Sequence, residues 1–232
     1  MTALADRPLT DLLDAFASPD PTPGGGSAAA LSGALGASLL AMVAALPKTK
    51  SGTPEERAAL DAARVDLLNA RGTLMALIDR DAAAYDAVVA AFRLPKATDE
   101  DKATRSRAIQ AGTLQATEVP IETIRACIDA LEAGRAVAAY GNPSAKSDIA
   151  VGVTTINTAV QGAMFNVEIN ISSLKDEAVV ARLVSDLKAL LDRGAALTRE
   201  LYTAAGLFGF VREAAERLGY ARDGKHAPSG RD

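Results

Sequence analysis

Residues 21–48 read PTPGGGSAAALSGALGASLLAMVAALPK, with no charged side chain before Lys48. Pro21 and Pro23 bar any helix that precedes this segment, because proline fixes φ and removes a backbone donor. After the glycines the residues are almost all Ala, Leu, Gly and Ser, until Pro47. This pattern predicts a helix over about 25–46 that is buried on all sides.

The same segment is long enough to cross a membrane, which takes about 20 mostly apolar residues. However, it is rich in Ala, Gly and Ser rather than Leu and Phe, and it has no aromatic belt at its ends. Residues 1–7 also lack the basic start and apolar run of a signal peptide. We therefore expect a core helix of a cytoplasmic protein that has no membrane partner.

A second weakly charged segment lies further along the chain, where Glu168 is the only charge between Asp148 and Lys175. It predicts another buried helix over about 147–173. The remaining helices are predicted by apolar periodicity and capping residues: one through Leu9, Leu12, Leu13 and Phe16, one from Thr53 to about Arg93, one from Thr98 to Tyr140 that Pro120 should kink or divide near Val119, one from Asp176 to about Ala205, and a short one near 207–218.

No segment alternates apolar and polar residues between turn signals, so we expect no sheet. The predicted fold is all-α: a single helical bundle over residues 1–222, with two buried, nearly uncharged helices, followed by a disordered tail over 223–232. Together these two helices have a large apolar surface for one bundle to bury. Part of that surface is therefore expected to form a subunit interface in a homodimer or larger homo-oligomer.

Charge and composition exclude several kinds of function. The net charge of −4 gives no basic field, so nucleic acid is not an expected partner. Cys127 and His226 are the only cysteine and histidine. We therefore expect no metal site, and neither a Ser-His-Asp nor a Cys-His mechanism. A catalytic site would have to use carboxylates, hydroxyls, amides, lysines and backbone dipoles.

The first candidate site is the start of the predicted helix at Gly24, Gly25, Gly26 and Ser27. A helix N-terminus has free N–H groups and a partial positive charge, and glycine lets a ligand approach the backbone. No strand precedes these glycines and no Gly-Lys-Ser/Thr follows, so neither a dinucleotide fingerprint nor a P-loop is indicated. A turn that allows tight packing explains the glycines equally well.

The second candidate site is the helix break from Gly141 to Asp148, with Asn142, Ser147 and Asp148 as its polar residues. Ser and Asp are common N-cap residues, and capping alone explains them well. The nearly uncharged helix that follows favours a functional role as well, because it places Asp148 at the mouth of a buried helix. The helix dipole should keep Asp148 ionised there.

Further candidates lie on the predicted helices. Asp81 and Tyr85 are one turn apart on one helix face, whereas Asp79 and Asp86 are expected to be solvated. Lys48 follows the first buried helix and could meet an acidic ligand, although an exposed lysine usually has no specific role. Asn166 lies in the second buried helix, where an amide must be hydrogen-bonded to another helix or to a ligand.

Several of these motifs, taken in order, resemble the cyclodeaminase/cyclohydrolase family of tetrahydrofolate enzymes. The resemblance covers about residues 9–205. The segments that carry it are Pro21 to Ala30, Ala41-Met42-Val43, Leu94-Pro95-Lys96 with Thr98 to Lys102, Ala116 to Pro120, Gly141-Asn142, Ser147-Asp148, and Asn166-Val167 with Asn170. Each motif alone is weakly specific, whereas their order and spacing together are quite specific.

The resemblance implies an all-helical enzyme that forms dimers or larger assemblies and binds a folate substrate. One branch of the family hydrolyses 5,10-methenyltetrahydrofolate to 10-formyltetrahydrofolate, and the other closes 5-formiminotetrahydrofolate to the methenyl form with loss of ammonia. No second, transferase-like domain accompanies the helical one in these 232 residues, which favours the cyclohydrolase. A cyclodeaminase, or a non-catalytic folate-binding or assembly protein, remains an alternative.

On this hypothesis Asp148 is the catalytic base that takes a proton from water, with Asp81 as second candidate. Asn142 and Ser147 would orient the water or the pterin, and the Gly24–Gly26 backbone would hold a polar part of the folate. No metal or redox cofactor is expected. The hypothesis requires the two buried helices to begin side by side, either within one chain or across a subunit interface.

The chain departs from the family pattern in two places. At residues 46–50 it lacks the usual Thr and Gly-Lys-rich run, and at 143–149 Pro143 to Lys146 and Ile149 are unusual. A changed substrate or a lost activity is therefore a further alternative.

Overall fold

The computed structural model of the chain describes residues 3–47 and 52–207, and this part is helical without any strand. The elements are η1 (Leu4–Asp6), α1 (Leu9–Ala17), α2 (Gly25–Ala45), α3 (Pro54–Phe92), α4 (Asp99–Tyr140), η2 (Pro143–Ala145), α5 (Lys146–Ile171) and α6 (Glu177–Ala204). The predicted all-α bundle is confirmed. Lys48, His226, the tail over 223–232 and all but the first residue of the helix expected near 207–218 lie outside the described residues.

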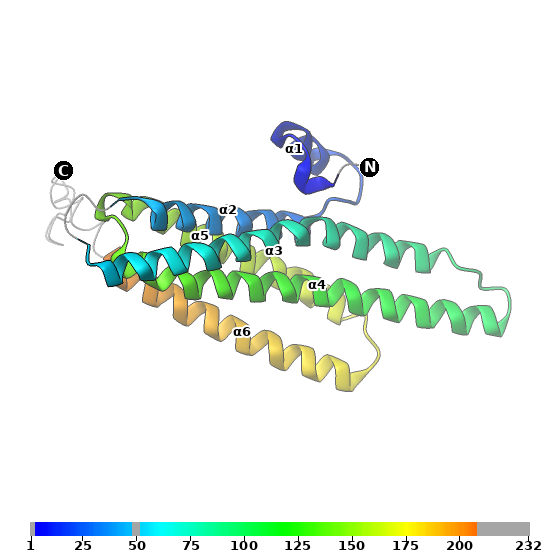
Figure 1. Cartoon of the computed structure of the whole chain (residues 1–232). Coiled ribbons are helices and arrows are strands. Elements are labelled where there is room, and N and C mark those ends of the chain that lie inside the picture. Colours follow the sequence, from blue (N-terminus) through cyan, green and yellow to red (C-terminus); the bar gives the residue numbers. More distant parts are fainter. Residues whose placement is uncertain (1–2, 48–51, 208–232) are drawn as a thin grey trace, which may run out of the picture.

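Helices α3 and α4 form a long antiparallel hairpin whose tip extends beyond the other helices (Figure 1). Both begin where the sequence predicts, after Thr53 and Thr98, and each of these threonines forms a capping box. Thr53 accepts a bond from the Glu56 N–H while Glu56 accepts one from the Thr53 N–H, and Thr98 and Asp101 form the same reciprocal pair. These bonds satisfy N–H groups that a helix start leaves without intrahelical partners.

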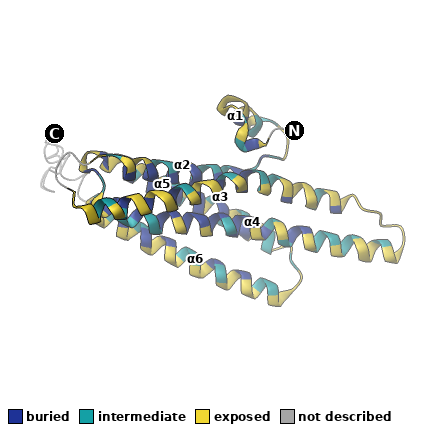
Figure 2. Cartoon of the chain, viewed as in Figure 1, coloured by how far each residue is buried: buried dark blue, intermediate teal, exposed yellow. Residues whose placement is uncertain are grey.

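Helix α2 packs against α3, α4 and α5, and buried positions follow its length (Figure 2). It is the one described helix that is long and apolar enough to span a bilayer, and 56% of its most apolar window is buried in the bundle. Its small residues allow α5 to approach closely. A Cβ atom on Gly36 would lie 2.6 Å from the carbonyl oxygen of Gly152.

Of the two outcomes predicted at Pro120, a kink or a division near Val119, the division is wrong, because α4 continues through Pro120 as one helix. Proline has no N–H, and Pro120 therefore leaves the Ala116 carbonyl without its usual intrahelical donor. The Asn170 side chain of α5 supplies the missing bond, with its Nδ2 donating to Ala116 O at 2.8 Å. A tertiary contact thus replaces the bond that proline removes.

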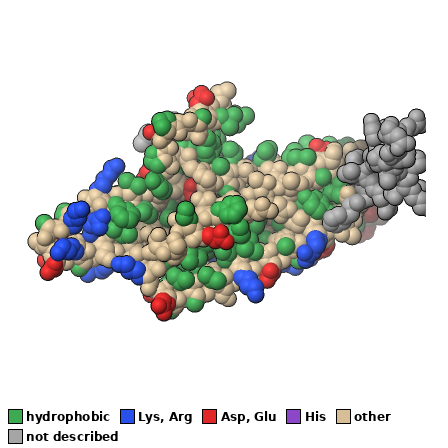
Figure 3. Space-filling model, turned by 180° about the vertical axis from the view of Figure 1, so that it is seen from behind, with side chains coloured by type: hydrophobic (Ala, Val, Ile, Leu, Met, Phe, Trp, Pro, Cys, Tyr) green, Lys and Arg blue, Asp and Glu red, His purple; other side chains and the backbone are tan. Residues whose placement is uncertain are grey.

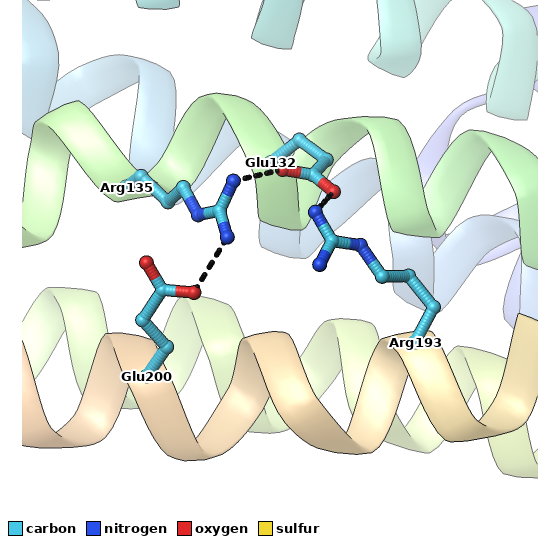
Figure 4. A network of polar contacts seen from close by, with 4 residues as sticks. All are labelled: Glu132, Arg135, Arg193 and Glu200. Carbon is cyan, nitrogen blue, oxygen red and sulfur yellow. Dashed lines mark hydrogen bonds and ion pairs between the residues drawn. The ribbon is translucent and has the colours of Figure 1, made fainter.

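Helix α6 lies along α4 and is joined to it by a network of charged side chains (Figure 4). Arg135 of α4 bridges Glu132 and Glu200, each at 2.7 Å, and Arg193 of α6 also pairs with Glu132. The buried leucines of α6, which packs against both α4 and α5, are Leu183, Leu187, Leu197 and Leu201. The network therefore flanks a narrow apolar seam.

The N-terminal segment, with α1, projects from the side of the bundle (Figure 1). It is tied down at η1, where the Leu4 and Ala5 N–H groups donate to the Asp79 carboxylate at 2.6 and 3.3 Å. Asp79 therefore anchors this segment to α3 rather than being free in solvent.

Candidate functional site

A cavity of about 520 Å³ opens between the start of α2, the last third of α3, the first half of α4 and the end of α5. Its volume lies within the range of small-molecule sites. Its polar lining is Thr22, Gly24, Gly25, Gly26, Asp81, Tyr85, Gln110, Thr113, Asn166, Asn170, Ser173 and Lys175, and its apolar lining is Pro21, Val88, Phe92, Ile109, Ala116 and Ile169.

The N-terminus of α2 forms one wall of this cavity. Its N-cap is Gly24, which has no side chain to accept bonds from the first turn. The Asp81 carboxylate of α3 lies against that turn instead, so close that a Cβ atom on Gly26 would be 2.0 Å from Asp81 Oδ1. Glycine is thus the residue that lets an acidic side chain reach the positive end of the helix.

Asp81 is held by Ser27, which is fully buried. The Ser27 hydroxyl lies 2.9 Å from Asp81 Oδ2 and 2.9 Å from the carbonyl oxygen of Ile78. A hydroxyl has one proton, so Ser27 donates to only one of these oxygens at a time. When Asp81 is protonated it can donate to Ser27 Oγ, and Ser27 can then donate to Ile78.

Burial raises the pKa of the Asp81 carboxyl above its ordinary value, while the hydrogen bonds from the Ser27 side chain and backbone lower it by less. A carboxyl whose pKa is raised toward neutral pH is better suited to take a proton and return it. Asp81 is the carboxylate among the described residues that line this cavity, whereas Asp129, whose pKa burial also raises, lies in a separate hollow between α3 and α4.

Two asparagines of α5, Asn166 and Asn170, also line the cavity and share one helix face. Asn166 Nδ2 donates to the Gly162 carbonyl at 2.8 Å, and Asn170 Nδ2 donates to the Ala116 carbonyl. Gly25 adjoins Asn166, because an added Cβ atom would lie 3.5 Å from its Nδ2. Backbone and amide groups therefore contribute to the polar lining.

Apolar side chains make up the rest of the lining. Phe92 and Ile169 have 54% and 71% of their surface exposed, and Val88 and Ile109 belong to the same apolar lining. Large apolar side chains exposed together in a hollow are typical of a ligand site. Lys175 stands at the rim, just after α5, and Gln110 holds its backbone by accepting from the Lys175 N–H at 2.8 Å.

The structure brings together six of the predicted site residues, Gly24, Gly25, Gly26, Asp81, Tyr85 and Asn166, in the lining of this cavity, with Ser27 directly behind Asp81. Sequence reasoning did not assign Asn170, Gln110 or Lys175 to the site. The spacing of four residues between Asn166 and Asn170 was a usable signal, because it places both amides on one helix face.

Asn142, Ser147 and Asp148 lie at the opposite end of the bundle. Helices α2 and α5 run antiparallel, since Gly25 adjoins Asn166 and Gly36 adjoins Gly152. The expectation that the two helices begin side by side within one chain is therefore wrong.

The break before α5 is held mainly by Asn142. Its Nδ2 donates to the Pro47 carbonyl at 2.9 Å, and its Oδ1 accepts from the Ser144 N–H. These bonds give Asn142 a structural role in joining the end of α2 to the start of α5. The Lys48 position predicted for a ligand lies next to this junction in sequence and outside the described residues.

Comparison with known proteins matches residues 8–189 to a family described as formiminotransferase-cyclodeaminase. A methenyltetrahydrofolate cyclohydrolase from Methylorubrum extorquens is 39% identical over 194 residues, which are 84% of this chain and 93% of that relative. A formimidoyltransferase-cyclodeaminase from Sus scrofa is 33% identical over 82% of this chain, and the match spans 35% of the relative's length.

A solved structure also matches. The crystal structure of a formiminotetrahydrofolate cyclodeaminase from Thermotoga maritima superposes with a TM-score of 0.79, covering 89% of this chain and 98% of that one, at 23% sequence identity. This likeness shows that the two proteins share a fold.

Proposed function

Because the chain belongs to the formiminotransferase-cyclodeaminase family, we propose that it hydrolyses 5,10-methenyltetrahydrofolate to 10-formyltetrahydrofolate. The observation that carries this proposal is the 39% identity to a methenyltetrahydrofolate cyclohydrolase over 93% of that protein's length. We place the reaction in the cytoplasm. It needs neither a metal nor a redox cofactor, because attack of water on a cationic carbon requires only proton transfers.

The cavity has the polarity that a folate requires. The polar lining at Asp81, Asn166 and the α2 N-terminus suits the polar pterin ring. The apolar lining at Phe92 and Ile169 suits the aromatic linker, and Lys175 suits the glutamate carboxylates. The cationic methenyl carbon would then lie within reach of the α3 side of the cavity.

Asp81 is proposed as the catalytic base, in place of Asp148. Its carboxylate takes a proton from the attacking water as the C–O bond forms, which gives a neutral hydroxyl adduct. Asp81 then returns the proton to N5 as the C–N5 bond breaks, and it takes the hydroxyl proton as the formyl C=O forms. That last proton passes to solvent, which balances the loss of the substrate's positive charge.

The experiment follows the methenyl chromophore after the purified protein is added. Rapid loss of absorbance with formation of 10-formyltetrahydrofolate supports the proposal. The same protein offered 5-formiminotetrahydrofolate, with ammonia measured, tests the cyclodeaminase alternative. Ammonia release without methenyl hydrolysis would assign the chain to that activity, and no turnover of either compound would reject both.

We further propose that the chain forms a homodimer through the outer face of α2 and α5. Figure 3 shows the molecule from behind, where hydrophobic side chains (green) are spread over the middle of the face and few charged ones are visible. Leu35 and Met42 of α2 and Val151 and Phe165 of α5 are exposed on these helices, and α2 has no charged residue. Between Ile149 and Ile171 the one charged residue of α5 is the exposed Glu168, so this face can meet its own copy with little like-charge repulsion.

Such a dimer offers a second position for Asp148. Because α2 and α5 run antiparallel, a twofold axis perpendicular to them would place Asp148 of the partner subunit near the Gly25 end of the first chain. Light scattering of the wild type and of L35K and F165K tests the interface, with the lysine variants expected to be monomeric. A monomeric wild type would reject the dimer, and an active D148N dimer would leave Asp81 as the base.

A further inference from the structure

The contact between α4 and α5 at the cavity depends on a proline. Pro120 provides no N–H to the Ala116 carbonyl, and Asn170 Nδ2 donates to that oxygen at 2.8 Å. Ala116 and Asn170 both line the cavity, so this bond lies in its wall.

The bond also fixes which way the Asn170 amide points. A carbonyl oxygen only accepts hydrogen bonds, so the group that faces Ala116 must be the NH₂. The same reasoning holds for Asn166, whose Nδ2 donates to the Gly162 carbonyl at 2.8 Å. In both residues the remaining atom, Oδ1, makes no hydrogen bond within the described chain. The two side chains therefore offer acceptors to the cavity.

We propose that Asn166 and Asn170 select the N–H edge of the substrate's aminopyrimidinone ring, with Asn170 held in its binding orientation by the carbonyl that Pro120 leaves free. This inference rests on the proposed function, since it names the part of the folate that the polar lining recognises. The edge carries a 2-amino group and a ring N–H, which are donors that match amide oxygens. Both asparagines are positioning residues for the substrate and take no proton.

Binding of tetrahydrofolate, measured by calorimetry, tests the proposal without relying on turnover. N170A is expected to weaken binding about tenfold, as loss of one buried hydrogen bond does. Binding of a 2-desamino tetrahydrofolate is expected to be weak to the wild type and little changed by N170A. In kinetics N170A should raise KM with kcat within about twofold.

P120A tests the role of the proline. An alanine N–H at position 120 competes for the Ala116 carbonyl, so tetrahydrofolate binding is expected to weaken about threefold or more while Tm does not fall. In the double variant P120A/N170A the loss should equal that of N170A alone, because the proline acts only through Asn170. Additive losses, or wild-type binding by P120A, would overturn the proposed role of Pro120.

N157A is the matched control, since Asn157 lies on the same helix and accepts a bond from Thr198 of α6 at 2.8 Å, away from the cavity. It should lower Tm and leave tetrahydrofolate binding unchanged. Equal affinity of wild type and N170A for tetrahydrofolate would overturn the inference alone. A wild type that neither binds nor converts folates would instead reject the proposed function.

Discussion

At the residue scale, the chemistry of the cavity depends on the balance between burial and hydrogen bonding at Asp81. Burial favours the neutral carboxyl, and the donors of Ser27 favour the charged one. Because Ser27 can turn its proton from Ile78 to Asp81, either form of the carboxyl keeps a partner. The pair can therefore pass through a cycle of proton uptake and release without leaving a buried group unpaired.

Replacing Asp81 by asparagine is expected to lower kcat by about 10²–10⁴-fold, the usual contribution of a general base. The wild-type kcat/KM should fall as the pH drops through the pKa of Asp81, which lies above the ordinary value for aspartate. Stopped-flow measurement of methenyl hydrolysis between pH 4 and pH 8 checks both. D79N, which alters the anchor of the N-terminal segment, is the control and should retain activity. Full activity in D81N would remove Asp81 from the mechanism.

D81N should also raise the free energy of unfolding at pH values above the raised pKa of Asp81. The folded state binds the Asp81 proton more tightly than the unfolded state, so the free energy of unfolding decreases as the pH rises from the unfolded pKa to the folded one. D81N removes this dependence. Its Tm should exceed that of the wild type at pH 8 and approach it near pH 3. A Tm difference that does not change with pH would contradict burial of the charge as the cause.

Gly26 should tolerate no side chain. In G26A the new Cβ atom would lie 2.0 Å from Asp81 Oδ1, so the carboxylate must move away from the α2 N-terminus. We expect at least a tenfold loss of kcat/KM with the helical content retained, as measured by kinetics and circular dichroism. G162A serves as control, because its Cβ would press on Ala29 at 3.2 Å and leave Asp81 untouched. Equal activities for the two variants would disprove the steric argument.

At the element scale, the sequence predicts helix ends well and helix partners poorly. Thr53 and Thr98 identify their helix starts because a capping box is formed by neighbours in sequence. Pro120 gives the wrong prediction of a divided helix, because the hydrogen bond that proline cannot donate to the Ala116 carbonyl is supplied by Asn170, 54 residues away from Ala116. A local pattern contains no information about such a distant donor.

Glycines within helices give a paired prediction at this scale. Gly72 of α3 has no atom within 4 Å of an added Cβ, so G72A should stabilise the protein by about 0.5–1 kcal/mol. In G36A the Cβ would lie 2.6 Å from both the Gly152 carbonyl oxygen and Ile156 Cγ1. Because these contacts are too short, α2 would have to move away from α5. We expect a loss of about 1–3 kcal/mol, measured by urea unfolding. A neutral G36A would show that the two helices are not in close contact.

At the scale of the whole molecule, the site arises from the direction in which α2 and α5 pack. The sequence predicts both buried helices and, through the resemblance, most of the residues at their ends. It does not state whether the two helices run parallel or antiparallel, and the antiparallel arrangement separates Asp148 from Gly25. Asp81 could be predicted only as a second candidate, because its neighbour Ser27 is 54 residues away in sequence.

The way the helices pack also predicts which of them unfolds locally most easily. Helix α2 packs against three helices, whereas α6 packs against α4 and α5 and buries only Leu183, Leu187, Gly194, Leu197 and Leu201. Amide hydrogen exchange should therefore be faster in α6 than in α2.

Removing the charged network with E132A and E200A together should raise exchange in α6 about three- to tenfold, since partly exposed ion pairs contribute about 0.2–1 kcal/mol each. Exchange in α2 should not change, because α6 can detach without disturbing α2. The matched control is D61A, which removes an exposed pair within α3, between Arg57 and Asp61, and should leave α6 unaffected. If the double variant instead accelerates exchange equally in α2 and α6, the bundle opens as one unit, and α6 contributes to the stability of the cavity itself.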